Sequence, residues 1–328
     1  MSLLGRDLAV DLGGARTRIY VRGKGIVLDE PSAVTIDART GKIIGYGADA
    51  TGDETCWPVS GGLPADGDLA RRMVRHFLSK VQRRPLARPR LVMALPDGAT
   101  PIERAALRDV AYEAEARQIV LIPHSLAAAL GAGLPVGDYV GGMVIDVGRD
   151  SARIAVLSGG EAVATTAVPS GGRAVNRAIA RLVEHEHGHT LDEHEAETAK
   201  RHAGGNSSQE DVTVRTRNPE TGHEHAVRLP TERIREAAAP AIESIVWAAM
   251  ETVERCPAEL TADLGERGTV LVGGGALLAG LAPRLRESLG MPVRQAERPL
   301  ECVALGLGAC ANDLGLLARL RGGRTRLR

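Results

Sequence analysis

The sequence predicts an α/β protein made of two lobes related by an internal duplication. A chain of 328 residues is too long for one compact core and suits two lobes. An apolar run, an Asp-x-Gly turn and a second apolar run occur at Asp11 and recur at Asp146. Segments with strand-like and helical spacing are interspersed along the chain, which favours sheets covered by helices.

The first half of the chain is predicted to alternate short strands with two clear helices. Apolar residues recur at helical spacing over 69–81, and Thr100-Pro101-Ile102-Glu103 carries the N-cap, first-turn proline and glutamate of a helix start. The expected strands are 8–10, 18–21, 25–36, 42–44, 91–95 and 118–122, with helices over 69–81, 100–116 and from Ser125, and a loop over 49–68.

The second half repeats the pattern around its own glycine turn. Three consecutive glycines, Gly273-Gly274-Gly275, follow an apolar run, which predicts a strand, a tight loop and a helix from Ala276. The expected strands are 143–147, 152–157 and 270–272, with helices over 174–184, 231–254 and 304–320, and a polar insert over 185–222 with a turn at 204–208.

Composition narrows the class of protein. The 41 basic and 41 acidic residues give a formal net charge of zero, so nothing global attracts the chain to nucleic acid. No apolar run reaches transmembrane length and no signal peptide is present, which predicts a cytoplasmic protein. The four scattered cysteines, without a C-x-x-C pair, are expected to be reduced and mostly buried.

An Asp-x-Gly turn between two strands has two interpretations. It is a plain turn, or its glycine lets a ligand approach the backbone while its amides form a nest for phosphate oxygens. In the second case the aspartate holds Mg²⁺ through water, so that turns at Asp11 and Asp146 clamp a triphosphate. The loop at Gly273 favours this interpretation because it brings bare backbone to an anionic group, although a closely packed turn is the alternative.

The order of two hairpins and a triple-glycine loop resembles the actin, sugar-kinase and DnaK-chaperone superfamily. Several stretches are similar to the MreB and Mbl proteins in particular: 25–32, 126–135, 256–260, 270–278 and 299–306. The resemblance covers nearly the whole chain and is weakest over 47–64 and 185–225. It implies an actin-like two-lobe fold with duplicated ribonuclease-H-like domains and small inserted subdomains.

The resemblance also implies lobe boundaries and a site for ATP or ADP with Mg²⁺. The lobes are expected at 1–141, with an insert at about 32–63, and at 142–310, with an insert at about 186–245, while 311–328 forms a C-terminal helix and tail that packs on the first lobe. The nucleotide residues implied are Asp11, Gly13, Gly14, Arg16, Asp146, Gly148, Gly172, Glu197, Lys200, Gly273, Gly274 and Gly275, with Asp11 and Asp146 holding Mg²⁺ through water. Taken alone, Glu197 and Lys200 are a solvent-exposed helical pair worth a few tenths of a kcal/mol.

The first phosphate turn departs from the family pattern. It usually reads Asp-Leu-Gly-Thr-Ala-Asn-Thr, whereas here Gly14 replaces the threonine and Arg16 the asparagine. Arg16 and Arg18 lie on one face of a strand by alternation. They are either phosphate ligands or solvated strand arginines.

The second phosphate turn departs further. The usual Asp-Ile-Gly-Gly-Gly-Thr-Thr has Arg149 and Asp150 in place of two glycines, and the following Gly-Gly-Asp is here Gly171-Gly172-Arg173. The new Cβ atoms obstruct the backbone, and the carboxylate repels phosphate. The family's Glu-Glu-Pro, which positions the attacking water, is Pro123-His124-Ser125. His124 is a poorer base than a carboxylate held near Mg²⁺, so we expect a weak ATPase at most.

Two other segments have open interpretations. The His-rich segment 185–194 is either a metal site or a solvated polar insert. The basic loop containing Arg83, Arg84, Leu86 and Arg88 occupies the position of the family's membrane-touching loop. It either binds anionic headgroups, at roughly 1 kcal/mol per arginine, or is a solvated loop.

The sequence therefore predicts a nucleotide-binding cytoskeletal protein of MreB/Mbl type. We expect head-to-tail filaments of the chain itself, at the inner face of the membrane, acting with the cell-wall synthesis machinery in cell shape. A non-hydrolysing partner of a true MreB-family filament is the first alternative, and a sugar or acetate-type kinase is the second. A chaperone-type ATPase is disfavoured because such a protein carries an additional substrate-binding domain, which we do not expect after residue 328.

Overall fold

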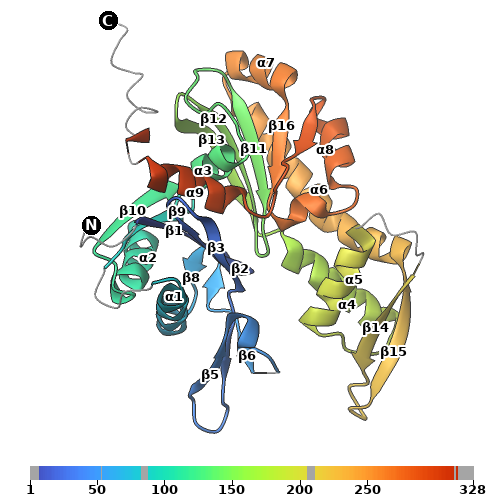
Figure 1. Cartoon of the computed structure of the whole chain (residues 1–328). Coiled ribbons are helices and arrows are strands. Elements are labelled where there is room, and N and C mark those ends of the chain that lie inside the picture. The colour runs from blue at the N-terminus through green and yellow to red at the C-terminus, as the bar shows by residue number, and fades with distance from the viewer. Residues whose placement is uncertain (1–6, 53, 83–87, 205–210, 314, 317–328) are drawn as a thin grey trace, which may run out of the picture. The chain divides into compact units, whose positions relative to one another are not determined.

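The computed structural model describes residues 7–52, 54–82, 88–204, 211–313 and 315–316 (Figure 1). The chain divides into two compact units. Unit 1 comprises the described parts of Met1–Val144, Leu157–Val163 and Leu300–Arg328, and unit 2 those of Ile145–Val156 and Ala164–Pro299. Among the described residues, no helix is long and apolar enough to span a membrane.

Unit 1 is built on a mixed five-stranded sheet in the order β10-β9-β1-β2-β3. Its strands are β1 (Asp7–Leu12), β2 (Arg16–Val21), β3 (Gly25–Pro31), β9 (Arg90–Leu95) and β10 (Gln118–Pro123). The first three pair antiparallel, β9 pairs parallel with β1, and β10 pairs parallel with β9. The predicted first hairpin is confirmed, with Asp11 opposite Arg18.

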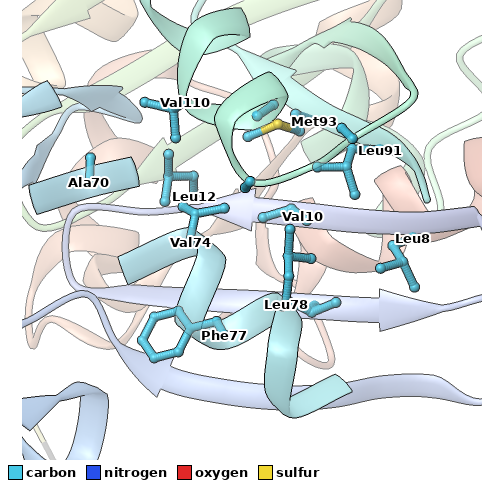
Figure 2. Packing of buried hydrophobic residues seen from close by; sticks show 14 of the residues in the cluster. Leu8, Val10, Leu12, Ala70, Val74, Phe77, Leu78, Leu91, Met93 and Val110 are labelled. Atoms are coloured by element: carbon cyan, nitrogen blue, oxygen red, sulfur yellow. The ribbon is translucent and has the colours of Figure 1, made fainter. Parts of the chain in front are cut away.

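Helices α1 (Gly67–Val81) and α2 (Pro101–Glu113) cover one face of this sheet with the main core of unit 1. Leu8, Val10 and Leu12 of β1 belong to that core, together with Phe77 of α1 (Figure 2). Side chains alternate along a strand, so Asp11 faces the opposite side of the sheet from Leu8, Val10 and Leu12. The capping box predicted at Thr100 is present, with both of its hydrogen bonds.

Helices α3 (His124–Gly131) and α9 (Cys302–Asn312) pack together at very short range in unit 1. A Cβ atom at Gly131 would lie 1.7 Å from the carbonyl oxygen of Cys302, and one at Gly306 would lie 1.9 Å from that of Ala127. The small residues of 126–135 and 299–306 are therefore needed for this crossing. It brings the chain back to unit 1 at Leu300, earlier than the expected boundary after residue 310.

The strands expected over 25–36 and 42–44 are confirmed in part by β4 (Val34–Ile36) and β5 (Ile43–Tyr46), which form a three-stranded sheet with β6 (Thr55–Cys56). The segment 49–68, expected to be loop, contains β6 and the small pair β7 (Val59–Ser60) and β8 (Leu63–Pro64). The 3-10 turn η1 (Gly47–Asp49) follows β5.

A second five-stranded sheet, most of which belongs to unit 2, repeats the strand order of the first sheet. Its order is β13-β12-β11-β16-β17, from β11 (Gly142–Val147), β12 (Ala152–Ser158), β13 (Glu161–Val168), β16 (Thr269–Val272) and β17 (Val293–Gln295). Read as β3-β2-β1-β9-β10, the first sheet has the same arrangement: a hairpin, an edge strand beside it, and two later strands on the other side. The internal duplication predicted from the two Asp-x-Gly turns is confirmed.

The helices predicted over 174–184 and 231–254 are confirmed as α4 (Gly172–His187) and α6 (Thr231–Glu254). Unit 2 also contains α5 (Glu193–Gly204), α7 (Ala258–Arg267) and α8 (Leu281–Leu289), and an antiparallel ribbon formed by β14 (Asp211–Arg217) and β15 (Glu224–Pro230). The polar segment 185–222 is therefore ordered helix and strand over most of its described length. Its expected turn at 204–208 lies outside the described residues, apart from Gly204.

Two predicted helices have different bounds. The helix expected from Ala276 is a 3-10 turn, η2 (Gly274–Leu277), and α8 begins only at Leu281. The C-terminal helix, expected over 304–320, is α9 and ends at Asn312, while 317–320 lie outside the described residues.

Candidate functional site

The first hairpin belongs to unit 1 and needs its glycine for backbone geometry. Asp11 is 8% exposed at the end of β1. The amide of Gly13 donates to the carbonyl oxygen of Arg16 at 3.1 Å, and a Cβ atom at Gly13 would lie 2.7 Å from that oxygen. Ser32 donates from Oγ to the carbonyl oxygen of Gly13 at 2.6 Å, which fixes the turn against the end of β3.

Both arginines of the first hairpin are held by Asp29 on β3. Arg16 donates from Nε to Asp29 Oδ1 at 2.6 Å and from Nη2 to its carbonyl oxygen at 2.7 Å. Arg18, 7% exposed, has its Nε 3.3 Å from Asp29 Oδ2. The sequence patterns offered phosphate ligands or solvated arginines, and the structure shows a third role, an ion-paired staple between β2 and β3.

The second hairpin belongs to unit 2, and its backbone carbonyl groups cap the start of α4. Its turn closes as in the first hairpin, with the amide of Gly148 donating to Ser151 at 3.0 Å. The carbonyl oxygens of Gly148 and Arg149 accept from the amides of Gly172 and Arg173, at 2.9 and 2.7 Å, at the start of α4. These first-turn amides, which an uncapped helix leaves open, are already occupied.

The triple-glycine loop packs directly on the second hairpin. Gly273 has φ +77°, and a Cβ atom there would lie 2.2 Å from Oδ1 of Asp146 and 2.5 Å from the carbonyl oxygen of Val147. A Cβ atom at Gly275 would lie 2.1 Å from Cγ1 of Val147, whereas Gly274 is exposed. Asp146, itself 6% exposed, is thus enclosed by the loop that was predicted from its glycines.

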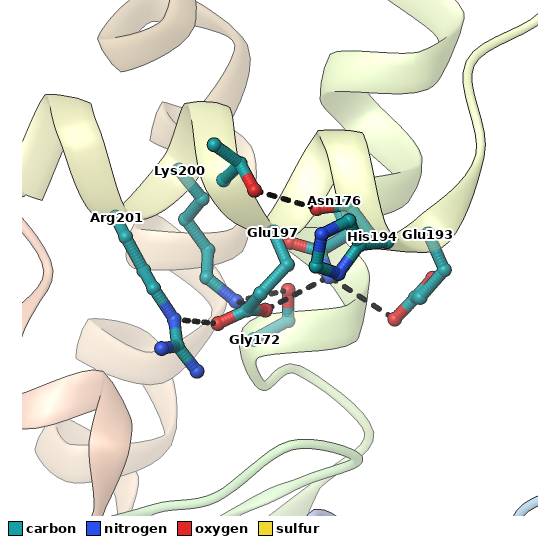
Figure 3. Close-up of polar contacts among 8 residues, drawn as sticks. Gly172, Asn176, Glu193, His194, Glu197, Lys200 and Arg201 are labelled. Atoms are coloured by element: carbon teal, nitrogen blue, oxygen red, sulfur yellow. Dashed lines mark hydrogen bonds and ion pairs between the residues drawn. The ribbon is translucent and has the colours of Figure 1, made fainter. Parts of the chain in front are cut away.

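Glu197 and Lys200 join α5 to the first turns of α4 (Figure 3). Lys200 Nζ lies 2.5 Å from Glu197 Oε2 and donates to the carbonyl oxygen of Gly172 at 3.3 Å. Glu197 also accepts from Asn176 Nδ2 at 3.1 Å and from Arg201 Nε at 2.8 Å. Burial alone would raise the pKa of Glu197, but Lys200, Arg201 and Asn176 outweigh it and lower the pKa to about 2.

The interpretation of Glu197 and Lys200 as a solvated pair is wrong. Their side chains are only 32% and 12% exposed. They form the centre of a hydrogen-bond network, in which Asn176 Nδ2 also donates to Glu193 Oε1 at 3.0 Å. Asp146, Gly148, Gly172, Gly273 and this network all lie within unit 2, so the sequence-predicted residues of that unit gather around one turn and one helix start.

The two charged residues of the second hairpin lie half-buried rather than in solvent. Asp150 Oδ1 is 3.8 Å from Arg173 Nη1. Burial lowers the pKa of Arg149, against the opposing effect of Asp150. Ser151 Oγ and Arg173 Nε are buried and make no hydrogen bond within the described part of the chain.

Around His124, a carboxylate that sequence reasoning missed holds the start of α3. His124 is 8% exposed. Asp97, in the turn after β9, accepts from the amide of Ser125 at 3.0 Å and from its Oγ at 2.7 Å. Asp97 therefore caps α3, whose own N-cap residue is a proline without a side-chain acceptor. The Asp-Gly dipeptide after a buried strand was the available signal.

The histidine-rich segment 185–194 runs from the end of α4 to the start of α5. His185 and His187 end α4 at the left-handed cap Gly188, and His189 stacks on His225 with ring centroids 4.7 Å apart. Within the described ranges, no group of three or more His, Cys, Asp or Glu side chains could hold a metal ion.

The basic loop is only partly described. Arg83, Arg84 and Leu86 lie outside the described residues, and Arg88 is exposed. Arg90, the next arginine, is in β9 with its Nε 3.6 Å from Asp7 Oδ1, so it belongs to the sheet and not to the loop.

A cavity of about 530 Å³ lies elsewhere in unit 2, against α6. Trp247, 65% exposed, lines it with Val168 and Glu251. None of the predicted nucleotide residues lines this cavity.

The residues of unit 2 fit a nucleotide in part. A buried carboxylate at a strand end, an exposed glycine backbone at Gly274 and a preorganised Glu197–Lys200 pair suit a magnesium ion, a base and a ribose respectively. Against this, the amide of Gly148 in the turn and the amides of Gly172 and Arg173 at the start of α4 are occupied by carbonyl groups of the same unit.

Comparison with known proteins places the chain in one family over its whole length. A family model described as MreB/Mbl protein matches residues 5–319. The cell shape-determining protein MreB of Escherichia coli K12 is 39% identical over 323 residues, covering 93% of each chain. The cell shape-determining protein Mbl of Bacillus subtilis 168 is 32% identical over 329 residues, covering 97% of this chain and 99% of the relative.

Solved structures give the same result for the fold. MreB5 of Spiroplasma citri bound to ADP is 25% identical, with a TM-score of 0.88 over 98% of this chain and 100% of that one. A MamK double helical filament, 18% identical, superposes with a TM-score of 0.79 and supports the fold alone. The actin-like fold is confirmed, and the chain belongs to the MreB/Mbl family.

Proposed function

We propose that this chain is a nucleotide-binding cytoskeletal protein that assembles into filaments and acts in cell shape. Its relatives in Escherichia coli and Bacillus subtilis are named as cell shape-determining proteins. MreB5 of Spiroplasma citri, at 25% identity, has been solved with ADP and with AMPPNP. The observation that carries the proposal is the gathering of Asp146, Gly172, Glu197, Lys200 and the Gly273 loop within unit 2.

In this proposal the nucleotide residues of unit 2 act together. Asp146 and Gly148 hold the phosphate end, Glu197 and Lys200 hold the ribose, and the glycine loop holds the base. When bound, Mg²⁺ would supply positive charge to the phosphates, and Asp146 would hold it through water.

Isothermal titration calorimetry with ADP tests this assignment. Lys200→Ala removes the cation that fixes Glu197, and we expect at least a tenfold loss of affinity, which corresponds to about 1.4 kcal/mol. Arg235→Ala, on α6 of the same unit, is the control and should leave affinity unchanged, because that side chain makes only weak surface contacts. Equal affinity of Lys200→Ala and the natural chain would remove the ribose assignment.

Hydrolysis in this proposal is weak or absent. His124 stands where the resemblance expects a glutamate, and Asp97 is engaged in capping α3. A neutral imidazole accepts a proton from water less effectively than a carboxylate near a metal ion. We expect the natural chain to release phosphate from ATP at a rate near background. The His124→Glu variant should release phosphate faster.

Self-assembly is tested by sedimentation and electron microscopy of the purified chain with ADP, with a non-hydrolysable ATP analogue and without nucleotide. We expect head-to-tail filaments in at least one nucleotide state. The occupied amides of Gly148, Gly172 and Arg173 favour a second candidate, a non-hydrolysing partner of another MreB-family filament. A chain that stays in the supernatant alone but pellets with such a partner would establish the second candidate instead.

We also propose that the chain lies at the inner face of the membrane through the loop containing Arg83, Arg84, Leu86 and Arg88. Sedimentation with anionic liposomes should be lost in the Arg83→Ser, Arg84→Ser, Arg88→Ser variant and at high salt. Arg90 is excluded from this variant because its contact with Asp7 is structural. Salt-independent binding by that variant would contradict the proposal.

A further inference from the structure

The charges at the second hairpin differ from those of the motif that the chain resembles. The usual motif and its following turn carry two carboxylates and no cation, so two negative charges face the phosphates. In this chain the corresponding residues are Asp146, Arg149, Asp150 and Arg173, two acids and two arginines. Their formal charges cancel, so this hairpin repels an anion less than the usual motif does.

Both arginines are held at the hairpin by its backbone. Arg173 begins the first turn of α4, where its amide donates to the carbonyl oxygen of Arg149 at 2.7 Å. The two residues are therefore joined directly, one in the turn and one on the helix. The N-cap residue, Gly171, offers no side-chain cap, so the positive end of the α4 dipole is not neutralised by a carboxylate at the cap.

Two buried donors at this point lack partners. Arg173 Nε and Ser151 Oγ are shielded from solvent and make no hydrogen bond within the described part of the chain. An incoming anion could supply the missing acceptor. Burial lowers the pKa of Arg149, against the effect of Asp150, Glu193 and Glu197, which raise it.

Arginine suits phosphate better than the glycines it replaces in one respect. Its guanidinium group stays charged at neutral pH and can donate two parallel hydrogen bonds to phosphate oxygens. A magnesium ion provides the same neutralising charge but must be recruited from solution. The cost of the exchange is the loss of close backbone approach at Arg149 and Asp150.

We propose that Arg149 and Arg173 take over the neutralisation of the nucleotide's phosphates at the second hairpin, so that this chain binds nucleoside diphosphates with little dependence on Mg²⁺. This inference rests on the proposed nucleotide-binding function. It concerns the second hairpin alone, because the arginines of the first hairpin are held by Asp29.

Calorimetric titration with ADP in excess Mg²⁺ and in excess EDTA tests the proposal. The natural chain should change its affinity by less than about threefold between the two conditions, which is well under 1.4 kcal/mol. The variant Arg149→Gly, Asp150→Gly, Arg173→Asp restores the usual motif, and its affinity for ADP should fall at least tenfold on removal of Mg²⁺. Arg177→Ala, an exposed position on the same helix, is the matched control and should behave like the natural chain.

Thermal unfolding followed by circular dichroism checks that the triple variant folds. If it does not, Arg173→Ala alone should weaken ADP binding in EDTA at least threefold more than in Mg²⁺. If the natural chain loses its affinity for ADP in EDTA, the arginine proposal is overturned, while the proposed nucleotide binding stands. Absence of ADP binding under every condition would overturn the proposed function itself.

Discussion

The two hairpins share a backbone but use their arginines in different ways. Each turn closes with the same bond between residues three apart, from Gly13 to Arg16 and from Gly148 to Ser151, at 3.1 and 3.0 Å. In unit 1 the arginines point along the sheet to Asp29 and tie β2 to β3. In unit 2, Arg149 and Arg173 lie at the start of α4, where Asp150 Oδ1 is 3.8 Å from Arg173 Nη1 and the N-cap residue, Gly171, has no side-chain acceptor.

This contrast shows that duplication preserved the geometry of a turn and not its electrostatics. A Cβ atom at Gly13 would collide with the opposite carbonyl oxygen at 2.7 Å, whereas one at Gly148 would lie 3.4 Å from the corresponding oxygen of its own turn. The charged side chains around the turn differ between the two hairpins, although the backbone of the turn is the same. The first hairpin is therefore a stapled structural element, and the second is an element supported from outside by α4 and the Gly273 loop.

The largest expected effect is on that outside support. Gly273→Ala places a Cβ atom 2.2 Å from Asp146 Oδ1 in a backbone with φ +77°. Overpacking and the left-handed conformation should together lower the free energy of unfolding by about 3 kcal/mol or more. Chemical denaturation followed by circular dichroism measures this change.

The matched control for Gly273 is Gly290→Ala in the same unit. Gly290 has φ +64°, but no atom lies within 4 Å of the position its Cβ would take. Only the backbone penalty of about 1–2 kcal/mol applies there. Equal destabilisation by the two variants would mean that the loop does not support the second hairpin.

Much of this arrangement could be predicted from the sequence because it rests on local chemistry. Glycines at fixed positions after apolar runs identified both hairpins and the Gly273 loop, and helical spacing identified α1. The internal duplication could be anticipated from the repeat of Asp11 at Asp146. These signals work because a tight turn limits the residues that can occupy it.

The remaining contacts depend on residues far apart in the sequence. Asp29 holds Arg16 across two strands, and Asp97 caps α3 from a separate turn, 28 positions away from Ser125. Neither partner leaves a periodic pattern. The sequence likewise placed Glu197 and Lys200 on a helix but gave no sign of their partners on α4, because Gly172 and Asn176 lie more than 20 positions away.

A smaller effect is expected from breaking the staple of the first hairpin. Asp29→Asn removes the charge shared by Arg16 and the buried Arg18. Asp29 is 41% exposed, so water partly replaces the interactions that the arginines lose in this variant. The free energy of unfolding should therefore fall by about 1–2 kcal/mol.

The control for Asp29 is Asp68→Asn on the exposed face of α1, which pairs with Arg71 and Arg72 at the surface. It should change stability by less than about 0.5 kcal/mol. If Asp29→Asn proves as mild as this control, then the arginines of the first hairpin are not stapled in solution and remain available to phosphate. The contrast between the two hairpins would then disappear.

The smallest effect concerns the network behind the second hairpin and depends on pH. The pKa of Glu197 is lowered from 4.5 to about 2, so the folded state holds the ionised form more tightly than the unfolded chain does. The resulting stability is fully present above pH 4.5 and is lost as the pH falls toward 2. Because the carboxylate is one-third exposed, screening leaves about 1 kcal/mol at neutral pH.

Glu197→Gln should therefore destabilise the protein at pH 7 by about 1 kcal/mol, and the difference from the natural chain should shrink as the solution is acidified below pH 4.5. Glu232→Gln, a 73% exposed partner of Arg235 on α6, serves as the control with little effect at any pH. Denaturation curves at a series of pH values give both differences. A constant difference down to pH 3 would show that Glu197 acts through packing rather than charge, and the electrostatic description of unit 2 would then have to rest on its arginines alone.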